Sequence, residues 1–304
     1  MFTHVLLPLD GSRLAESALP AADSLAQAFG ASVTLVHVIE QDAPAEVHGQ
    51  PHLRTPDEAD AYLRAVAARS ISPGVPVEYH VHTGEVTHVA RSIVEHIGDF
   101  AADLIVMCTH GRGGLHDLLF GSIAQQVIAL GVTPTMIIHP SADEPSPGFG
   151  CRRLFIPLDD DPAHQQSVPV AAEIARRCQS AVHVIHIVPT LGTLSSRWSA
   201  AGRLLPGTTT RMLDMSVEAA VEYLRGVQQE LQNAGISATY DVFRGDPAEV
   251  IARAARELGA DLIVLGTHGK TGTKAFWSES VGAQVCRSCR IPLLLVPVPK
   301  RKSI

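Results

Sequence analysis

The chain has 304 residues and a mass of 32.4 kDa, and 46% of its residues are hydrophobic and 18% are charged. That length is comfortable for two domains, and the composition excludes an intrinsically disordered chain. The net charge of −7 argues against nucleic-acid binding, and no apolar run approaches the roughly 18–20 residues that span a bilayer, so we expect neither nucleic acid nor a membrane as a partner.

The cysteine content and the N-terminal residues bear on the compartment. Five cysteines are thinly spread along the chain, and an odd number fits reduced thiols better than a disulfide framework. The first residues, MFTHVLLPLD, contain no basic region and no small-residue cleavage site, so we expect no secretory signal. We therefore expect a cytoplasmic protein.

In the first half of the chain, short apolar runs rich in β-branched residues alternate with longer amphipathic segments. The runs predict strands, and the segments predict helices. We expect strands at 4–9, 32–38, 76–82, 103–108 and 134–139, and helices at 12–29, 57–70, 86–98 and 118–130. This alternation predicts right-handed crossovers and a doubly wound parallel sheet.

The second half repeats the first. HVLLPLD (4–10) recurs as RLFIPLD (153–159), and ADLIVMCTHG (102–111) recurs as ADLIVLGTHG (260–269). Strands are expected again at 153–158, 181–187, 237–243, 261–266 and 292–297, and helices at 165–178, 209–233, 247–258 and 279–289. Two long copies indicate a duplicated domain rather than a solenoid.

The repeat predicts two tandem domains of the same α/β class. We place the first domain at 1–140 and the second at 152–304. Residues 141–151 between them are rich in Pro, Gly and Ser, which is typical of a linker. Ligands of doubly wound sheets bind beyond the carboxyl ends of the strands, so we look for the functional residues there.

Two segments of each copy follow predicted strands and have matching chemistry. LDGS (9–12) follows the first strand and is matched by LDDD (158–161) in the second copy. The loop and helix start CTHGRGGLHDLLFGSIAQQV (108–127) follow the fourth strand and are matched by GTHGKTGTKAFWSESVGAQV (266–285). Asp10 or Asp159 could accept hydrogen bonds from a ligand there, or only cap the next helix.

The loop after the fourth strand has the composition of a phosphate site. Glycine lets the backbone approach a phosphate closely, and the N–H groups at a helix N-terminus favour an anion. Arg112 would add a cation and Ser122 a hydroxyl donor. The alternative is a Gly-rich turn with a serine cap and no ligand.

Common catalytic nucleotide motifs do not match. The residues Gly269-Lys270-Thr271 resemble the end of a Walker loop, but the required first glycine falls on Val264. The sequence also lacks a G-x-G-x-x-G fingerprint after the first strand, a G-x-S-x-G elbow and an H-E-x-x-H helix. We assign no catalytic residue.

The pattern G-x2-G-x9-G-[ST] after a fourth parallel strand, with an Asp closing the first strand, resembles the universal stress protein family. The resemblance covers nearly the whole chain in two tandem copies. It implies two Rossmann-like domains related to the adenine nucleotide α-hydrolases, each with a parallel five-stranded sheet in the order 3-2-1-4-5. It also implies binding of ATP, ADP or AMP, with Mg²⁺ as a charge-compensating companion rather than an ion held in its own carboxylate cage.

The resemblance also implies the site residues. In the first copy, Asp10 and the backbone of Val38 would meet the adenine, and Met107 and Cys108 would border the ribose. The phosphates would lie at Gly111, Arg112, Gly121, Ser122 and Ile123. The matching positions of the second copy are Asp159, Ile187, Leu265, Gly266, Gly269, Lys270, Glu279, Ser280 and Val281.

Each copy departs from the family pattern at one position. In the first copy Cys108 replaces the first glycine of the pattern and crowds the ribose, whereas Gly111 and Gly121, the glycines expected at the phosphates, match the pattern. In the second copy Glu279 replaces the second phosphate glycine and puts a carboxylate where the triphosphate would lie. Two like charges about 4 Å apart repel by roughly 1 kcal/mol in water and by more in a desolvated site. We therefore expect nucleotide binding mainly in the first domain.

These observations favour a regulatory, nucleotide-binding protein of the stress response. Two alternatives stay open. One is a slow ATPase that uses His110 or Asp10. The other is a ligand-free scaffold whose sites are filled by its own side chains. In either case we expect association through the final strands, within one chain as a pseudo-dimer or between chains as a homodimer.

Two further residue groups are interpreted as structural. Cys286 and Cys289 lie on the last predicted helix without a second ligand pair, which favours buried helix cysteines over a metal or redox site. His80 and His82 share one face of a strand, with His88 nearby. We interpret them as ordinary histidines, a metal site being the alternative, and we assign no metal ligand.

Overall fold

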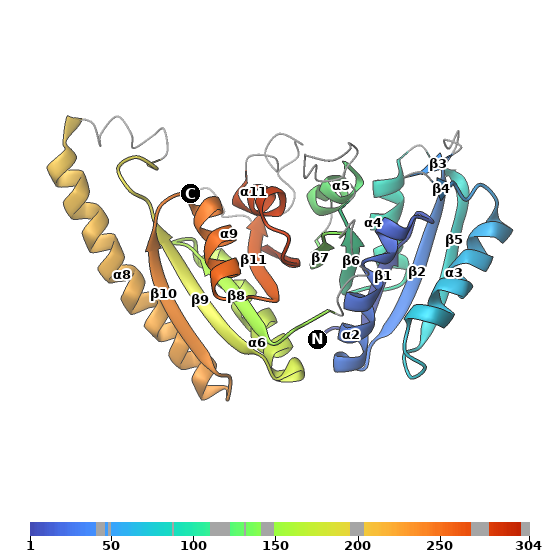
Figure 1. Ribbon diagram of the computed structural model, residues 1–304, viewed down its shortest axis with the longest axis horizontal. Coiled ribbons are helices and arrows are strands. Elements are labelled where there is room, and N and C mark those ends of the chain that lie inside the picture. Colours follow the sequence, from blue (N-terminus) through green and yellow to red (C-terminus); the bar gives the residue numbers. More distant parts are fainter. Residues whose placement is uncertain are drawn as a thin grey trace.

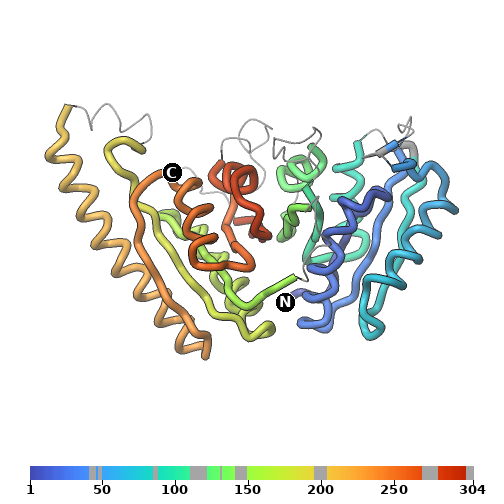
Figure 2. The backbone as a smooth tube through the Cα atoms, in the orientation of Figure 1, coloured from blue at the N-terminus to red at the C-terminus, as the bar shows by residue number. Residues whose placement is uncertain are grey.

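The computed structural model describes residues 1–40, 46–47, 50–86, 88–109, 122–130, 132–140, 149–194, 204–268 and 280–298. Over these residues the chain forms one curved sheet with helices on both faces (Figure 1). The first half of the chain, blue to green, occupies one side of the molecule, and the second half, yellow to red, occupies the other (Figure 2).

The elements alternate as the sequence predicts. The first half contains β1 (His4–Pro8), α1 (Arg13–Glu16), α2 (Leu19–Phe29), β2 (Ser32–Glu40), β3 (Glu46–Val47), β4 (Gln50–Pro51), α3 (Pro56–Ser70), β5 (Val77–Val86), α4 (Val89–Asp99), β6 (Leu104–Cys108), α5 (Ser122–Leu130) and β7 (Thr135–Ile138). The second half contains β8 (Arg153–Leu158), the 3₁₀ helix η1 (Pro162–Gln166), α6 (Ser167–Cys178), β9 (Ala181–Val188), α8 (Pro206–Asn233), β10 (Ala238–Arg244), α9 (Pro247–Glu257), β11 (Leu262–His268), α11 (Val281–Ser288) and β12 (Leu293–Val298).

Ten strands form a single sheet in the order β10-β9-β8-β11-β12-β7-β6-β1-β2-β5. Within each half all neighbours are parallel, and counting the five large strands of a half in chain order reads 3-2-1-4-5. The expected α/β fold is therefore confirmed. The two sheets are also continuous, because β12 pairs antiparallel with β7 through Leu293–Ile137, Leu294–Met136 and Leu295–Thr135.

Two apolar layers cover the sheet. One core joins one face of the sheet to α2, α3, α6 and α8, and the other joins the opposite face to α4, α5, α9 and α11 (Figure 1). Runs such as Leu104–Met107 and Leu262–Leu265 are buried along their whole length because both faces are covered. Among the helices of the described ranges, none has the length and apolar character that crossing a bilayer requires.

The first helix of each half differs from the expectation. The helix predicted over 12–29 is divided into α1 and α2, and the one over 165–178 is preceded by η1. Pro20 lies in the first turn of α2, and Pro169 lies at the matching position of α6. A proline has no N–H for the preceding turn and clashes with its carbonyl, so an α-helix can restart there but cannot run through.

Two other departures lie in the first half. The short hairpin of β3 and β4, in which Val47 pairs with Gln50, was not expected. Strand β5 continues to Val86 and α4 begins only at Val89, whereas the sequence predicts the strand to end at 82 and the helix to begin at 86. Apolar periodicity is weak in both segments, so it could not locate these boundaries.

His139 follows β7, close to the junction between the halves. Its Nδ1 lies 3.1 Å from the Thr109 hydroxyl, and its buried Nε2 has no hydrogen-bond partner among the described residues. Burial, and then the positive charge of Arg290, lower the pKa of His139 to about 4. The imidazole is therefore neutral in the folded protein at neutral pH.

We expect His139 to make stability pH-dependent. Its pKa is about 4 when folded and 6.5 in the reference state, so unfolding takes up a proton between these values. Its contribution to stability is complete above pH 6.5 and is lost as the pH falls towards 4, and the loss amounts to about 2 kcal/mol at pH 5. Urea unfolding at pH 7.5 and 5 should show a smaller pH effect for His139→Asn, which cannot be protonated, than for the parent. An unchanged pH effect would contradict this assignment. The exposed His88→Asn serves as the control.

Candidate functional site

In each half the first and fourth strands stop pairing before they end, and we call the place between the two strands beyond their last pair the crevice of that half. The ladder between β1 and β6 consists of Val5–Leu104 and Leu6–Ile105, although both strands continue beyond it. In the second half the ladder between β8 and β11 likewise consists of Leu154–Leu262 and Phe155–Ile263. The strand order reverses at these two places, which is where doubly wound folds bind ligands.

A proline ends each ladder. Leu9 donates its N–H to Val36 O at 2.8 Å, so the odd-numbered residues of β1 face β2. The carbonyl of His4 accepts from Asp103 N at 3.0 Å, so the even-numbered residues face β6. Pro8 is even-numbered, and it has no N–H to donate towards β6. The crevice therefore begins at Pro8.

The same parity holds in the second half. Arg153 O accepts from Asp261 N at 2.9 Å, which directs Arg153, Phe155 and Pro157 towards β11. Pro157 therefore ends that ladder in the same way. The motif P-L-D in both repeats thus encodes the end of the central ladder and an aspartate directly after it.

In the first half, Asp10 begins a tight turn at the end of β1. Its Oδ1 accepts from Ser12 N at 2.9 Å, and the Ser12 hydroxyl accepts from Ala15 N at 3.2 Å and caps α1. Gly11 between them has a φ of +90°, a left-handed conformation that favours glycine. The carboxylate is therefore held at the mouth of the crevice by its own turn, and capping is shared with Ser12.

Strand β4 and the residues that follow it lie against this turn. Gln50 Oε1 accepts from Arg13 N at 2.7 Å, and a Cβ on Gly11 would lie 3.0 Å from Leu53 Cδ1. His37 on β2 bonds Leu9 O through Nδ1 at 2.8 Å, and burial is the largest cause that lowers its pKa. This wall of the site was not predicted, because no pattern in 46–53 indicates a contact with residue 11.

The other expected residues of the first site line the strands. Val38 lies near the end of β2, and Met107 and Cys108 end β6, and all three side chains are buried. The Cys108 thiol accepts from the Ser17 hydroxyl at 3.3 Å, and burial raises its pKa to about 12. A thiol in this state is a poor redox sensor.

The phosphate end is described only in part. Ser122 and Ile123 form the exposed start of α5. The remaining expected residues of this loop, Gly111, Arg112 and Gly121, and also His110, lie outside the described residues, as do Gly269, Lys270 and Glu279 of the second half.

In the second half, side chains occupy the mouth of the crevice. His164 Nδ1 lies 2.8 Å from Asp159 Oδ1, and His268 Nε2 lies 3.1 Å from Asp161 Oδ2. The two imidazole rings are 4.7 Å apart. Burial opposes the charge on His164, but the hydrogen bond and charge of Asp159 raise its pKa overall. Potential ligand atoms of Asp161, His164 and His268 lie within 4.8 Å of one another, so this group could also hold a metal ion.

Gly266 brings the η1 segment close to β11. A Cβ on Gly266 would lie 2.9 Å from the Cα of His164 and 3.0 Å from its carbonyl oxygen. Cys108, the matching residue of the first half, carries a side chain at this place. The glycine therefore serves a close contact within the chain.

The other expected residues of the second site that the structure describes lie on strands or at a helix start. Ile187 lies on β9 and Leu265 on β11. The Ser280 hydroxyl accepts from Ala283 N at 3.2 Å and caps α11, whose first residue is Val281. Cys286 lies on α11 and Cys289 directly after it, and both are buried, as the sequence predicts.

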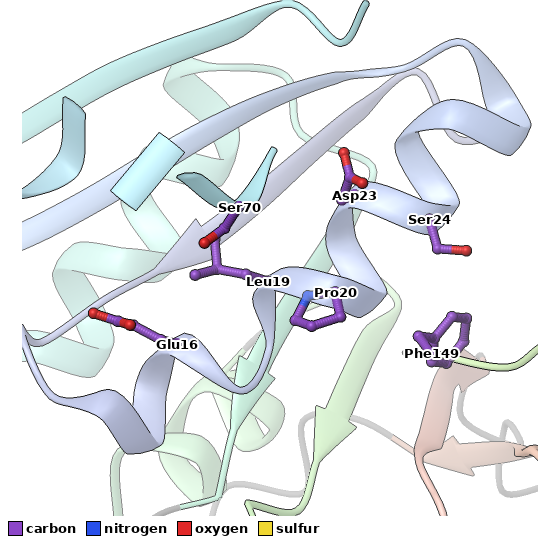
Figure 3. A pocket seen from close by; sticks show the side chains of 7 residues that line it. All are labelled: Glu16, Leu19, Pro20, Asp23, Ser24, Ser70 and Phe149. Atoms are coloured by element: carbon purple, nitrogen blue, oxygen red, sulfur yellow. The ribbon is translucent and has the colours of Figure 1, made fainter. Parts of the chain in front are cut away.

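A pocket of about 440 Å³ lies along α2 (Figure 3). Ser70 lies at one side of it, and Phe149, from the segment between the two halves, lies at another. Its lining contains Glu16 and Asp23 but no cation, so it does not resemble a phosphate site.

A comparison with models of protein families shows to which family this chain is related. The model of the universal stress protein family matches residues 1–139 and again residues 150–297. The chain belongs to the universal stress protein family. A universal stress protein of Mycolicibacterium smegmatis is 23% identical over 307 residues, covering 96% of each chain. One from Methanocaldococcus jannaschii is 28% identical over 155 residues, covering 50% of this chain and 85% of the relative.

Solved structures support the tandem fold of this universal stress protein. A protein of unknown function from Pseudomonas aeruginosa PAO1 superposes with a TM-score of 0.69 at 17% identity, covering 98% of this chain and 93% of that one. A universal stress protein from Archaeoglobus fulgidus superposes with a TM-score of 0.65 at 16% identity, covering 97% and 96%. At these identities the likeness concerns the fold alone.

We expect Gly266→Ala to destabilise this universal stress protein by about 1–3 kcal/mol, because the new Cβ meets backbone atoms that cannot move aside. Gly226→Ala within α8 meets no atom within 4 Å and should stabilise by about 0.5–1 kcal/mol. Urea unfolding of the two variants should therefore give shifts of opposite sign. Equal shifts would show that the contact with His164 is unimportant.

Proposed function

We propose that the first half binds an adenine nucleotide, ATP in particular, in the crevice between β1 and β6, and that this binding has a regulatory role in a stress response. The observation that carries the proposal is the crevice itself, which Pro8 opens at the reversal of strand order and which has Asp10 at its mouth. Family membership supports the choice of ligand.

The chemistry of the mouth suits the two ends of a nucleotide. A carboxylate at Asp10 can accept a hydrogen bond from an exocyclic amine, and the backbone of β2 at Val38 can pair with a base edge. The N–H groups in the first turn of a helix such as α5 have no partners within the helix, and Ser122 adds a hydroxyl, which together favour phosphate oxygens. In this proposal Mg²⁺ accompanies the phosphates, and no residue of the chain is assigned to it.

In the proposal the second half contributes structure and association rather than a second nucleotide site. His164 and Asp159 bond to each other where the sugar would enter, and η1 packs against Gly266. We therefore apply the alternative of a ligand-free scaffold to the second half only. The pairing of β7 with β12 already provides the association expected within one chain, and a homodimer and a cytoplasmic location stay predictions from the sequence.

Calorimetric titration of the full chain with Mg-ATP should give one site per chain. Asp10→Asn keeps an oxygen for the Ser12 N–H but removes the charge, and should weaken ATP binding by about 10-fold or more. Asp159→Asn is the matched control, because Asp159 makes the same turn with Asp161 N at 3.0 Å, and it should leave binding unchanged.

Other results would contradict this proposal. Absence of binding, in heat and in thermal shift, would favour a ligand-free scaffold. Two sites per chain would show that the second crevice is open. Release of phosphate over many turnovers, lost in Asp10→Asn, would favour a slow ATPase over a binding protein.

The second crevice should become a nucleotide site only when two residues change together. His164→Ala restores the residue at the matching first-half position, Ala15, and Glu279→Gly restores the counterpart of Gly121. We expect the double variant to bind two ATP molecules per chain and each single variant to bind one, because ring and carboxylate obstruct different ends of the ligand. Calorimetric stoichiometry distinguishes these outcomes. A second site in either single variant would show that one obstacle is enough.

A further inference from the structure

Three histidines of the first half meet between the edge strand and the helix that covers it. His80 and His82 lie on β5, the last strand of the sheet, and their side chains share one face because they are two residues apart. His96 lies on α4, which packs over this face (Figure 1). His88, which the sequence suggests as the neighbour, instead caps the start of α4.

The imidazole nitrogens converge. His96 Nε2 lies 2.6 Å from His80 Nε2 and 3.2 Å from His82 Nδ1. Ligand atoms of the three residues all lie within 4.8 Å of one another. Nitrogen ligands of a tetrahedral zinc ion, at about 2.0–2.1 Å from the metal, are separated by about 3.3 Å. Small rotations of the rings bring the three nitrogens to that spacing.

The tautomer of His96 is suited to binding a metal. Its Nδ1 lies 2.8 Å from the carbonyl oxygen of Ser92, which can only accept, so Nδ1 carries the proton. The lone pair of Nε2 then points at the other two rings. A metal-binding histidine commonly has its second nitrogen oriented by a carbonyl in this way. His96 is only 5% exposed, so it is held firmly.

The surroundings leave room for the cluster. Burial, and then the neighbouring His96 and His82, lower the pKa of His80. Phe100 packs its ring 5.1 Å from that of His80. A Cβ on residue 84 would lie 2.8 Å from His82 Nε2, so Gly84 is what allows the His82 ring to fold along the strand.

We propose that His80, His82 and His96 form a binding site for Zn²⁺, with a fourth position for water. Three imidazoles without a carboxylate ligand suit a borderline divalent cation such as zinc and disfavour Mg²⁺ and Ca²⁺. The ion would tie the edge strand β5 to α4. The zinc proposal does not depend on the nucleotide proposal, because none of the three histidines is one of the crevice residues.

The test uses the full chain without an affinity tag, stripped of metal and titrated with ZnCl₂ against a chromophoric chelator. His82→Gln and His96→Gln should each weaken zinc binding by at least about 100-fold. His88→Gln, an exposed histidine of the same segment, should bind as the parent does. Zinc should raise the melting temperature of the parent and of His88→Gln, but not that of His82→Gln.

Because His96 is buried, His82→Gln keeps the test valid if His96→Gln fails to fold. The variant His268→Gln tests at which place the ion binds, because Asp161, His164 and His268 form a second group that could hold a metal ion. X-ray absorption of the zinc-loaded parent should show three imidazole ligands. The proposal is wrong if the parent binds no zinc, if His82→Gln binds it as tightly as the parent, or if binding is lost in His268→Gln instead.

Discussion

A missing hydrogen-bond donor determines where the central strands of each half stop pairing. Pro8 and Pro157 face the fourth strand of their halves and cannot donate to it, so each central ladder ends after two residue pairs. In a parallel sheet a gap between central strands would expose backbone groups, unless turns and helix ends cover it. Here Asp10 and Asp159 begin those turns, so the crevice and its acidic mouth follow from one P-L-D segment.

The two halves share this frame and differ in what fills it. Ala15 and Cys108 of the first half correspond to His164 and Gly266 of the second. In the second half His164 stands in place of the smaller Ala15, and Gly266 stands in place of Cys108. With this pair of changes the segment after the first strand stays close to the fourth strand, and an imidazole lies at the mouth of the crevice. The duplicated fold has thus kept its backbone, while the second copy has polar contacts between its own side chains at this place.

The antiparallel pairing of β7 with β12 turns two domains into one ten-stranded sheet. It covers the edge that each half would otherwise expose, and leaves β5 and β10 as the outer strands. The three histidines lie at one of these outer strands. A metal ion there would fasten an edge that has a neighbour on one side only.

Much of this organisation could be predicted from the sequence. The duplication, the alternating strands and helices, the α/β class and the family follow from local repeats and periodicity, because buried parallel strands and helix starts have local composition. The positions of Asp10, Val38 and Cys108 at the carboxyl ends of strands, and of Ser122 at the start of a helix, follow from the same reasoning, because strand and helix ends can be counted along a chain.

Contacts between distant segments could not be predicted in this way. The contact of Leu53 with Gly11 and that of His164 with Gly266 join residues separated by many elements, and no periodicity records them. The same is true of His96, which replaces the expected His88 because α4 begins later than the sequence indicates. By itself the sequence determined the repeated fold and the ends of the strands, which is where folds of this class bind ligands. Only the tertiary structure decided which crevice is filled and which histidines meet, because both depend on side chains packed across the sheet.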